Sequence, residues 1–265
     1  MTPAISVITV SRNAAATITQ TLASVAAQEG VAVEHLVVDG GSSDGTAEII
    51  SAHAGQLAFW VSEPDQGIAE AMNKGIAAAR GEWLFFLQAD DFLLEPESLR
   101  RAAAECRARP DAMVAFPVRW ISRAGGTIRD VPAEGAGLKS RFKQIVRHQG
   151  LFVPRHVFER VGPFDPRYRV LMDLEHLFRA RAAGAPLVAV GGAPVAAMRD
   201  GGISSRRDWS GLRERLLEER ELHRRYARGA GWRLAYECFS LAYLSYRWLR
   251  ARWPGTSSYA VGPQA

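Results

Sequence analysis

Four nearly continuous apolar runs occur in the first 100 residues, and segments with helical periodicity lie between them. The apolar runs predict strands at 5–10, 34–39, 57–63 and 82–87. The intervening segments predict helices at 14–28, 46–53 and 68–80. Strands that are apolar along their whole length are buried on both faces, which is typical of a parallel sheet covered by helices on both sides. The alternation therefore predicts an α/β fold.

The pattern changes after Pro110. Two further strands are predicted around a turn at 124–126, a helix follows, and then a late strand: 114–121, 127–131, 173–183 and 187–190. From Arg207 onward the periodicity is helical, with a break at 229–231. We expect a helical appendage there.

Composition narrows the class of protein. A chain of 265 residues that is 48% hydrophobic can bury a sizeable core, as one large domain or one domain with an appendage. Two cysteines, Cys106 and Cys238, favour a reducing cytosol and predict neither a disulfide nor a zinc site. The run at 5–10 is too short for a signal peptide, and no uncharged stretch approaches the roughly 18 residues of a membrane span.

The basic charge is confined to the C-terminal part of the chain. Segment 206–253 holds 12 arginines and six acidic residues, a net charge of +6, whereas the whole chain has +5 and the remainder therefore −1. The basic balance thus describes the appendage and not the main domain.

Acidic residues follow three of the predicted strands. Asp39 ends the second, Asp65 follows the third, and Asp90 and Asp91 follow the fourth. Ligands of open α/β sheets bind outside the carboxyl ends of the strands, where several aspartates suit hydroxyl groups and a divalent cation. Asp is also common in turns and helix caps, but four at one sheet edge favour a site.

Three common α/β functions lack their motifs here. A dinucleotide enzyme would carry G-x-G-x-x-G after the first strand, where this chain has residues 11–15, SRNAA, and no P-loop lysine motif is present. A sugar nucleotidyltransferase should carry a glycine-rich loop with a basic residue at the same place. Those glycines are missing.

Seven segments, weak singly and specific jointly, cover about 200 residues: SVITVSRN (6–13), HLVVDGGSSDGT (35–46), EPDQGIAEAMNKGIAAARGEWLFFLQADD (63–91), HQGLFV (148–153), GPFD (162–165), DLEH (173–176) and GGIS (201–204). In this order they resemble family 2 glycosyltransferases of the GT-A fold, nearest to the bacterial colanic acid and capsule type. The resemblance implies a Rossmann-like, mostly parallel sheet with helices on both faces.

The resemblance also implies a donor site. The nucleotide-sugar would contact the first-strand loop and residues at the ends of the next three strands: Thr9, Arg12, Asn13, Asp39, Asp65, Lys74 and Asp90. Lys74 equally fits a solvated helix lysine. Asp90 and Asp91 resemble the metal-binding signature, which implies Mg²⁺ or Mn²⁺. The more acidic form of that signature begins with Asp where this chain has Gln88, so either carboxylate could contact the metal.

Asp173 resembles the general base of the family, at the start of a helix. Glu175 is the alternative base, and a plain helix cap is the alternative role for Asp173. His148 and Gln149 match a dipeptide near the acceptor site, although an isolated His is more often structural. Ser204 lies in a GGIS segment that resembles a loop closing over the diphosphate, with Arg206 and Arg207 within reach, or forms a surface turn.

The expected domains are a catalytic domain, a helical region and a tail: 1–205 (with a donor half 1–109 and an acceptor half 110–205), 206–253 and 254–265. Five aromatic residues of the helical region recur at spacings of three and four, which predicts one stripe on a helix: Trp232, Tyr236, Phe239, Tyr243 and Tyr246. With the nearby arginines, this stripe fits a membrane interface or packing against protein.

With this resemblance, we expect a cytosolic, membrane-peripheral glycosyltransferase in surface polysaccharide synthesis, and the resemblance implies an inverting mechanism. It also implies transfer of a sugar from a nucleotide donor, with a UDP-sugar as the first candidate, to a saccharide or lipid-linked acceptor. A sugar nucleotidyltransferase is the alternative enzyme. A non-catalytic protein whose arginine-rich tail binds nucleic acid is the other alternative, disfavoured because glutamates interrupt the arginines.

Overall fold

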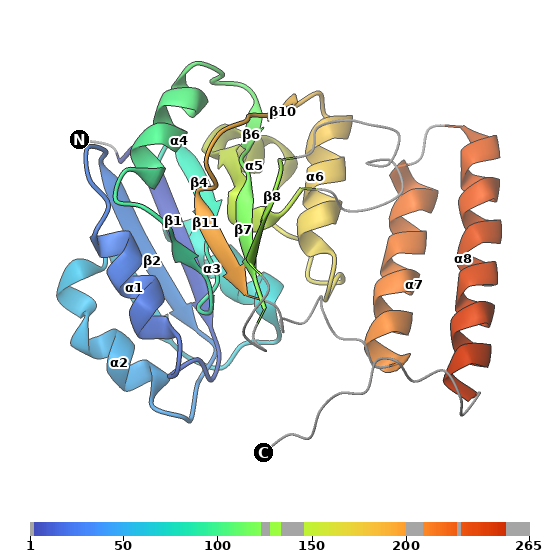
Figure 1. The fold of residues 1–265 in the computed structure, drawn as a ribbon, viewed down its shortest axis with the longest axis horizontal. Helices are drawn as coiled ribbons and strands as arrows, with labels where there is room; N and C mark the ends of the chain where they lie inside the picture. The colour runs from blue at the N-terminus through green and yellow to red at the C-terminus, as the bar shows by residue number, and fades with distance from the viewer. Residues whose placement is uncertain (1–2, 123–127, 134–145, 200–208, 227–228, 253–265) are drawn as a thin grey trace. The chain divides into compact units, whose positions relative to one another are not determined.

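A computed structural model describes residues 3–122, 128–133, 146–199, 209–226 and 229–252 (Figure 1). The chain divides into two compact units, residues 1–201 and 202–265. Each unit is described by itself.

A central sheet forms the middle layer of the first unit. Among the described residues it has seven strands, in the order β10-β6-β9-β4-β1-β2-β3. Their bounds are β1 Ile5–Ser11, β2 Val33–Asp39, β3 Phe59–Ser62, β4 Trp83–Phe86, β6 Met113–Ala115, β9 Leu151–Pro154 and β10 Leu187–Ala189. β9 runs antiparallel to β4 and β6, and the other pairings are parallel. The predicted mostly parallel sheet is confirmed.

Helices cover both faces of this sheet (Figure 1). They are α1 Ile18–Ala26, α2 Thr46–Ala52, α3 Ile68–Ala78, α4 Ser98–Arg107, α5 Arg155–Val161 and α6 Met172–Ala182. Adjacent residues of β4 point to opposite faces, as strand geometry requires. Phe85 stacks on Phe152, with 4.4 Å between ring centres, in the core that α1 and α4 close. Phe86 faces the other side and packs on Phe158 of α5, with 5.9 Å between ring centres. The β4 strand is therefore buried on both sides.

The segment 114–121, predicted as one strand, forms two. β6 ends at Ala115 in the central sheet, and β7 (Val118–Ile121) belongs to a second sheet. Pro117 lies between them and cannot donate to a strand ladder, while its carbonyl accepts the N–H of Val195. The prediction of a single strand was wrong because it ignored this proline.

The second sheet has the order β5-β11-β7-β8. The other members are β5 Phe92–Leu93, β8 Ile128–Val131 and β11 Ala196–Arg199. β7 and β8 lie within the two strands predicted around the turn at 124–126, and they pair antiparallel. The turn itself lies outside the described residues. β5 and β11 were not predicted. β5 begins directly after Asp91, and β11 ends at Arg199, whose backbone N–H bonds to Asp91.

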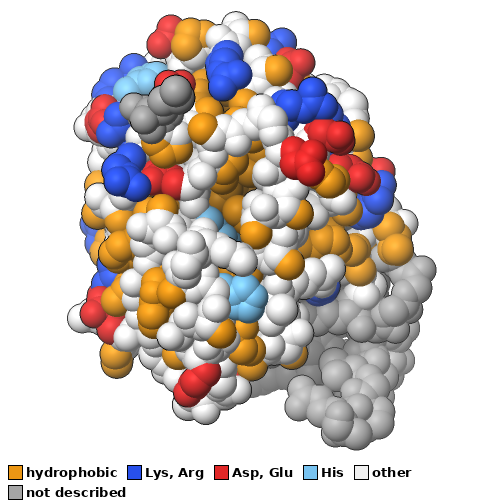
Figure 2. Space-filling view, turned by 90° about the vertical axis from the view of Figure 1, so that its left-hand side faces the viewer, with side chains coloured by type: hydrophobic (Ala, Val, Ile, Leu, Met, Phe, Trp, Pro, Cys, Tyr) orange, Lys and Arg blue, Asp and Glu red, His pale blue; other side chains and the backbone are white. Residues whose placement is uncertain are grey.

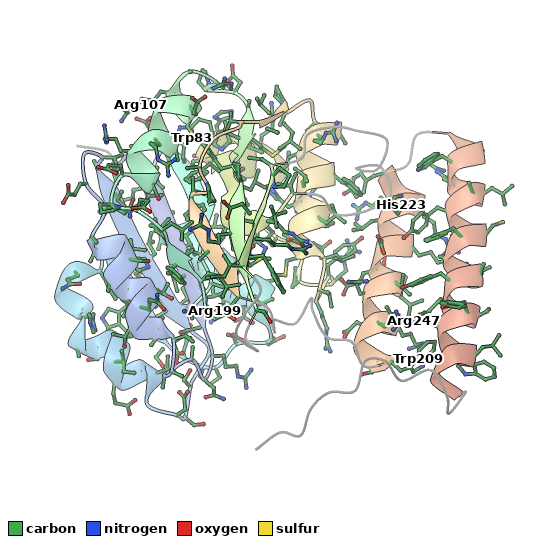
Figure 3. All side chains as sticks on the ribbon, viewed as in Figure 1. Trp83, Arg107, Arg199, Trp209, His223 and Arg247 are labelled. Carbon is green, nitrogen blue, oxygen red and sulfur yellow. The ribbon has the colours of Figure 1, made fainter. Side chains whose placement is uncertain are left out.

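The second unit contains the helices α7 (Trp209–Tyr226) and α8 (Ala230–Arg252). His223 of α7, which Figure 3 labels, stacks on Tyr236 of α8 with 3.7 Å between the ring centres. Glu237 forms ion pairs with Arg220 and Arg224. The stripe predicted on α8 is therefore divided, because Tyr236 packs against α7 while Phe239 and Tyr246 are exposed.

Candidate active site at the carboxyl edge of the central sheet

The ends of β1, β2, β3 and β4 meet at one edge, since these four strands are parallel. The segment that follows β4 continues alongside β1, because Ala89 donates its N–H to the Val10 carbonyl. The short helix η3 (His148–Gly150) precedes the antiparallel strand β9 and so reaches the same edge. This edge carries the predicted site residues.

Asp39 is the last residue of β2 and is completely buried. Its carboxylate accepts hydrogen bonds from the hydroxyls of Ser11, Ser42 and Ser62 and from the Ser42 N–H. Burial raises the pKa of Asp39, but the hydrogen bonds from Ser42, Ser62 and Ser11 outweigh it and hold the pKa below its usual range. Asp39 therefore stays ionised and ties three strand ends together.

Asn13 connects the loops that follow β1 and β2. It has a positive φ of 51°, donates its N–H to Ser42 Oγ at 2.8 Å, and accepts the Ser43 N–H at 3.0 Å. Arg12 beside it is exposed. Thr9 lies inside the sheet and is fully buried, with its Oγ1 2.9 Å from Nε2 of His35. Its side chain therefore cannot contact a ligand at the edge, and only its backbone could.

Asp65 packs against Gly40, where a Cβ would lie 2.3 Å from Asp65 Oδ2. The glycine thus leaves room for the Asp65 carboxylate beside the end of β2. Lys74 on α3 forms ion pairs with Glu63 at 2.8 Å and Glu70 at 3.1 Å. Its ammonium would have to leave these carboxylates to contact a donor.

Asp90 and Asp91 have different environments. Asp90 is half-buried, whereas Asp91 is 1% exposed. Asp91 Oδ1 accepts the backbone N–H of Arg199, and Oδ2 accepts the side-chain N–H of Gln149, both at 2.9 Å. Burial and the charge of Asp90 raise the pKa of Asp91 to about 7, against these two hydrogen bonds.

His148 and Asp173 face each other at the same edge. Nδ1 of His148 lies 3.2 Å from Asp173 Oδ2, and its Nε2 lies 3.4 Å from Nε2 of Gln88. Asp173 lies in the first turn of α6, whose N-cap is Leu171, so Asp173 is not the cap residue. Its Oδ1 accepts the N–H of Leu174 at 2.8 Å.

Glu175 points elsewhere. It is 1% exposed and forms an ion pair with Arg179 at 2.9 Å. The structure therefore brings Asp173, His148, Gln149, Asp90 and Asp91 together and turns Glu175 away from them. Ser204, Arg206 and Arg207 lie outside the described residues.

Sequence reasoning missed the role of Arg199, which Figure 3 labels at the end of β11. Its guanidinium donates to the Asp90 carbonyl and to Gln20 of α1, and lies 4.9 Å from the centre of the Phe92 ring. Arg199 thereby fixes the backbone of the acidic pair. Its place just before the predicted glycine loop was the available signal.

Within the described residues, no group of three or more His, Cys, Asp or Glu side chains could enclose a metal ion. The half-buried Asp90 still fits Mg²⁺ or Mn²⁺, because such ions are commonly held by one or two carboxylates together with substrate phosphates. The donor set therefore suits a cation that arrives with a diphosphate.

Comparison with known proteins decides the family. Residues 6–161 match Glycosyl transferase family 2. The chain belongs to this family. A PGL/p-HBAD biosynthesis glycosyltransferase of Mycobacterium bovis is 36% identical over 184 residues, 67% of this chain and 69% of the relative. The succinoglycan biosynthesis protein ExoO of Rhizobium meliloti is 32% identical over 48% of this chain and 36% of its own length. This family 2 protein is a glycosyltransferase.

Solved structures support the GT-A fold. S. aureus TarS 1-349 in complex with UDP-GlcNAc superposes with a TM-score of 0.66 at 15% identity, covering 93% of this chain and 72% of TarS 1-349. The chain spans 39% of the longer TarS structure. A mannosyltransferase of Pyrobaculum calidifontis, PcManGT, in complex with GDP-Man and Mn²⁺ superposes with a TM-score of 0.64 at 18% identity. The match covers 97% of this chain and 77% of PcManGT.

Proposed function

We propose that this glycosyltransferase is an inverting enzyme that transfers a sugar from a nucleotide-sugar to a hydroxyl of a saccharide or lipid-linked acceptor. A UDP-sugar is the first donor candidate. The observation that carries the proposal is the placement of Asp173, paired with His148, at the sheet edge that also holds Asp90. Residues 1–109 would bind the donor and residues 110–205 the acceptor, with 206–253 an added helical region and 254–265 a tail.

The reaction is a single displacement. Asp173 accepts the proton of the acceptor hydroxyl while that oxygen attacks the anomeric carbon, and the nucleoside diphosphate leaves with the bonding electron pair. Ser42, Asn13 and Asp65 line the donor side, where Asp39 holds the strand ends in place. Asp90 would hold a Mg²⁺ or Mn²⁺ ion, which would supply Lewis-acid stabilisation of the departing diphosphate.

Between the carboxylates, Asp90 is the better candidate for the cation. Both oxygens of Asp91 already accept hydrogen bonds within the fold. If Asp91 turned to a cation instead, the N–H groups of Gln149 and Arg199 would lose their acceptor. Asp91 instead orients the segment that presents Asp90.

The appendage would hold the enzyme at the cytoplasmic face of a membrane. Every exposed residue of α8 from Leu234 to Leu249 is uncharged. The large apolar members are Leu234, Phe239, Leu241, Tyr246, Trp248 and Leu249. Such a face suits an interfacial helix. No helix in the described part of the chain is long and apolar enough to cross a bilayer.

Nucleic acid is not expected as a partner. Arg220 and Arg224 pair with Glu237 inside the second unit. On the face that carries α1 and α2, Figure 2 shows basic and acidic side chains interspersed. A polyanion would require a continuous basic surface.

A product experiment tests the proposal. The full chain is screened by thermal shift against UDP- and GDP-sugars with and without Mn²⁺, since a bound donor raises the melting temperature by mass action. The stabilising donor is then incubated with saccharide acceptors. Release of nucleoside diphosphate and a product of inverted anomeric configuration support the proposal. Pyrophosphate release or a retained configuration contradicts it.

A further inference from the structure

Three side chains from distant segments contact one another in series at the active-site edge: Gln88 after β4, His148 in η3 and Asp173 in α6. Gln88 and His148 are 60 residues apart in the chain, and His148 and Asp173 are 25 apart. His148 is the middle member, with one ring nitrogen toward each neighbour.

The chemistry of the end groups fixes the direction of the hydrogen bonds. The group of Gln88 that faces His148 is its amide nitrogen, which can only donate, so Nε2 of His148 must accept. A neutral imidazole with an accepting Nε2 carries its proton on Nδ1. That Nδ1–H then points at Oδ2 of Asp173, which can only accept as a carboxylate.

We propose that His148 is a positioning residue for Asp173, and that Gln88 selects the tautomer of His148 that donates to the carboxylate. The proposal rests on the proposed role of Asp173 as general base. It also explains the amide at position 88, because a carboxylate there could not donate to Nε2.

Asp173 gains a defined orientation from this arrangement. Leu174 donates its N–H to Oδ1 and His148 donates to Oδ2, so each oxygen is held from a different element. These two donors hold the carboxylate from α6 itself and from η3, so its orientation does not depend on one element alone. The side chains of His148 and Asp173 are 26% and 16% exposed, so a substrate hydroxyl can reach the pair.

Two amide variants separate the functions of the two ring nitrogens. In His148→Asn, the side-chain amide can place an N–H near the position of Nδ1 and keep the bond to Asp173. In His148→Gln, the amide reaches the position of Nε2 and keeps only the contact with Gln88. We expect kcat per folded molecule to fall by roughly 10- to 100-fold in His148→Gln, the scale of losing alignment of a reacting group. We expect most of kcat to remain in His148→Asn, with the donor KM similar in both.

A spectroscopic measurement tests the tautomer without relying on turnover. In full-length protein labelled with ¹⁵N-histidine, the His148 signals are assigned by their absence from His148→Asn. We expect the wild type to show a protonated Nδ1 and an unprotonated Nε2 at neutral pH. In Gln88→Leu, the donor to Nε2 is lost and only the bond to Asp173 still favours a proton on Nδ1. We therefore expect a larger share of His148 to carry its proton on Nε2 than in the wild type, and kcat to fall.

Each outcome either supports or overturns the assignment. A wild-type His148 with its proton on Nε2, or on both nitrogens, overturns it, as do equal kcat values for His148→Asn and His148→Gln. If Asp173→Asn keeps full turnover, the proposed general base fails instead. The nitrogen signals would still report whether Gln88 selects the tautomer.

Discussion

Gln149 donates its side-chain N–H to Oδ2 of Asp91 across 2.9 Å, with both side chains almost inaccessible to solvent. This bond joins the turn before β9 to the segment after β4. Because Arg199 of β11 occupies the other oxygen, Asp91 ties three distant segments together and leaves Asp90 as the more accessible carboxylate. The adjacent residues Asp90 and Asp91 thus differ in role, since Asp91 holds the fold together and Asp90 is the one that a ligand can reach.

The first prediction separates the two carboxylates. Asp90→Asn should abolish the part of donor affinity that depends on Mn²⁺, because a neutral amide binds a divalent cation poorly. Isothermal titration with the donor, with and without EDTA, measures this. Identical donor affinity of wild type and Asp90→Asn in Mn²⁺ would remove Asp90 from the cation site.

Asp91→Asn is the matched variant. The Gln149 Oε1 atom is buried without a hydrogen-bond partner among the described residues, so rotating that amide would let it accept an N–H from the new side-chain amide at position 91. We therefore expect Asp91→Asn to fold and to weaken cation-dependent donor binding less than Asp90→Asn does. A larger loss in Asp91→Asn would make Asp91 the direct ligand.

The second prediction concerns Asp173. Asp173→Asn keeps the shape of the side chain but cannot accept a proton, so single-turnover transfer should fall by roughly 10²–10⁴-fold. Donor affinity should change little. Glu175→Gln is the comparison, because it disturbs the buried pair with Arg179 and should lower stability rather than the rate per folded molecule. A greater rate loss in Glu175→Gln would reverse the two assignments.

The strands β1 to β4 were predictable from the sequence because their apolar runs are bounded by polar or turn residues such as Asp39 and Gly81. The short strands β5 and β11 were not. β5 has only two residues, and β11 (AAMR) holds two alanines, a residue type that is depleted in strands. Pro117 was visible in the sequence, and its effect on 114–121 could have been predicted.

The site was predictable as residue types but not as contacts. The carboxylates were located by their positions after strands. The partners of Asp91 lie 58 and 108 residues away, and no local pattern indicates that Gln149 and Arg199 meet it. Likewise Gln88 could be recognised only as a departure from the acidic signature until His148 was placed beside it.

The third prediction tests Arg199. Its guanidinium holds the Asp90 carbonyl, Gln20 and the face of Phe92 at once, which the point charge of lysine cannot do. Arg199→Lys should therefore raise the donor Kd by roughly 10- to 100-fold, since one lost charge-assisted hydrogen bond amounts to about 1.5–3 kcal/mol. An unchanged Kd would show that the other contacts suffice to hold this segment.

The fourth prediction concerns pH. His176 stacks on Phe158 at 4.1 Å, and burial, with the charge of Arg179, lowers its pKa to about 3. Below about pH 6.5 the unfolded chain binds a proton there that the native state does not, so the free energy of unfolding falls as the pH falls. Phe is similar in shape and cannot titrate. When the pH is lowered from 7 to 5, the free energy of unfolding should therefore fall further in the wild type than in His176→Phe, by up to about 2 kcal/mol. Urea unfolding at both values measures it, and equal losses would contradict it.

The last prediction concerns the uncharged face of α8. Changing Leu234, Leu241 and Trp248 together to Ser removes three large exposed side chains that lie seven residues apart on one side of the helix. Partial burial of such groups at a bilayer surface should contribute enough that affinity for anionic vesicles falls on the order of 10²-fold. The matched control changes three small residues of the same face, Ala235, Cys238 and Ala242, to Ser and should bind as the wild type does. Co-sedimentation with phosphatidylglycerol-containing vesicles measures both variants. If the triple variant keeps vesicle binding but changes the oligomeric state, the face is a protein contact and the membrane proposal fails.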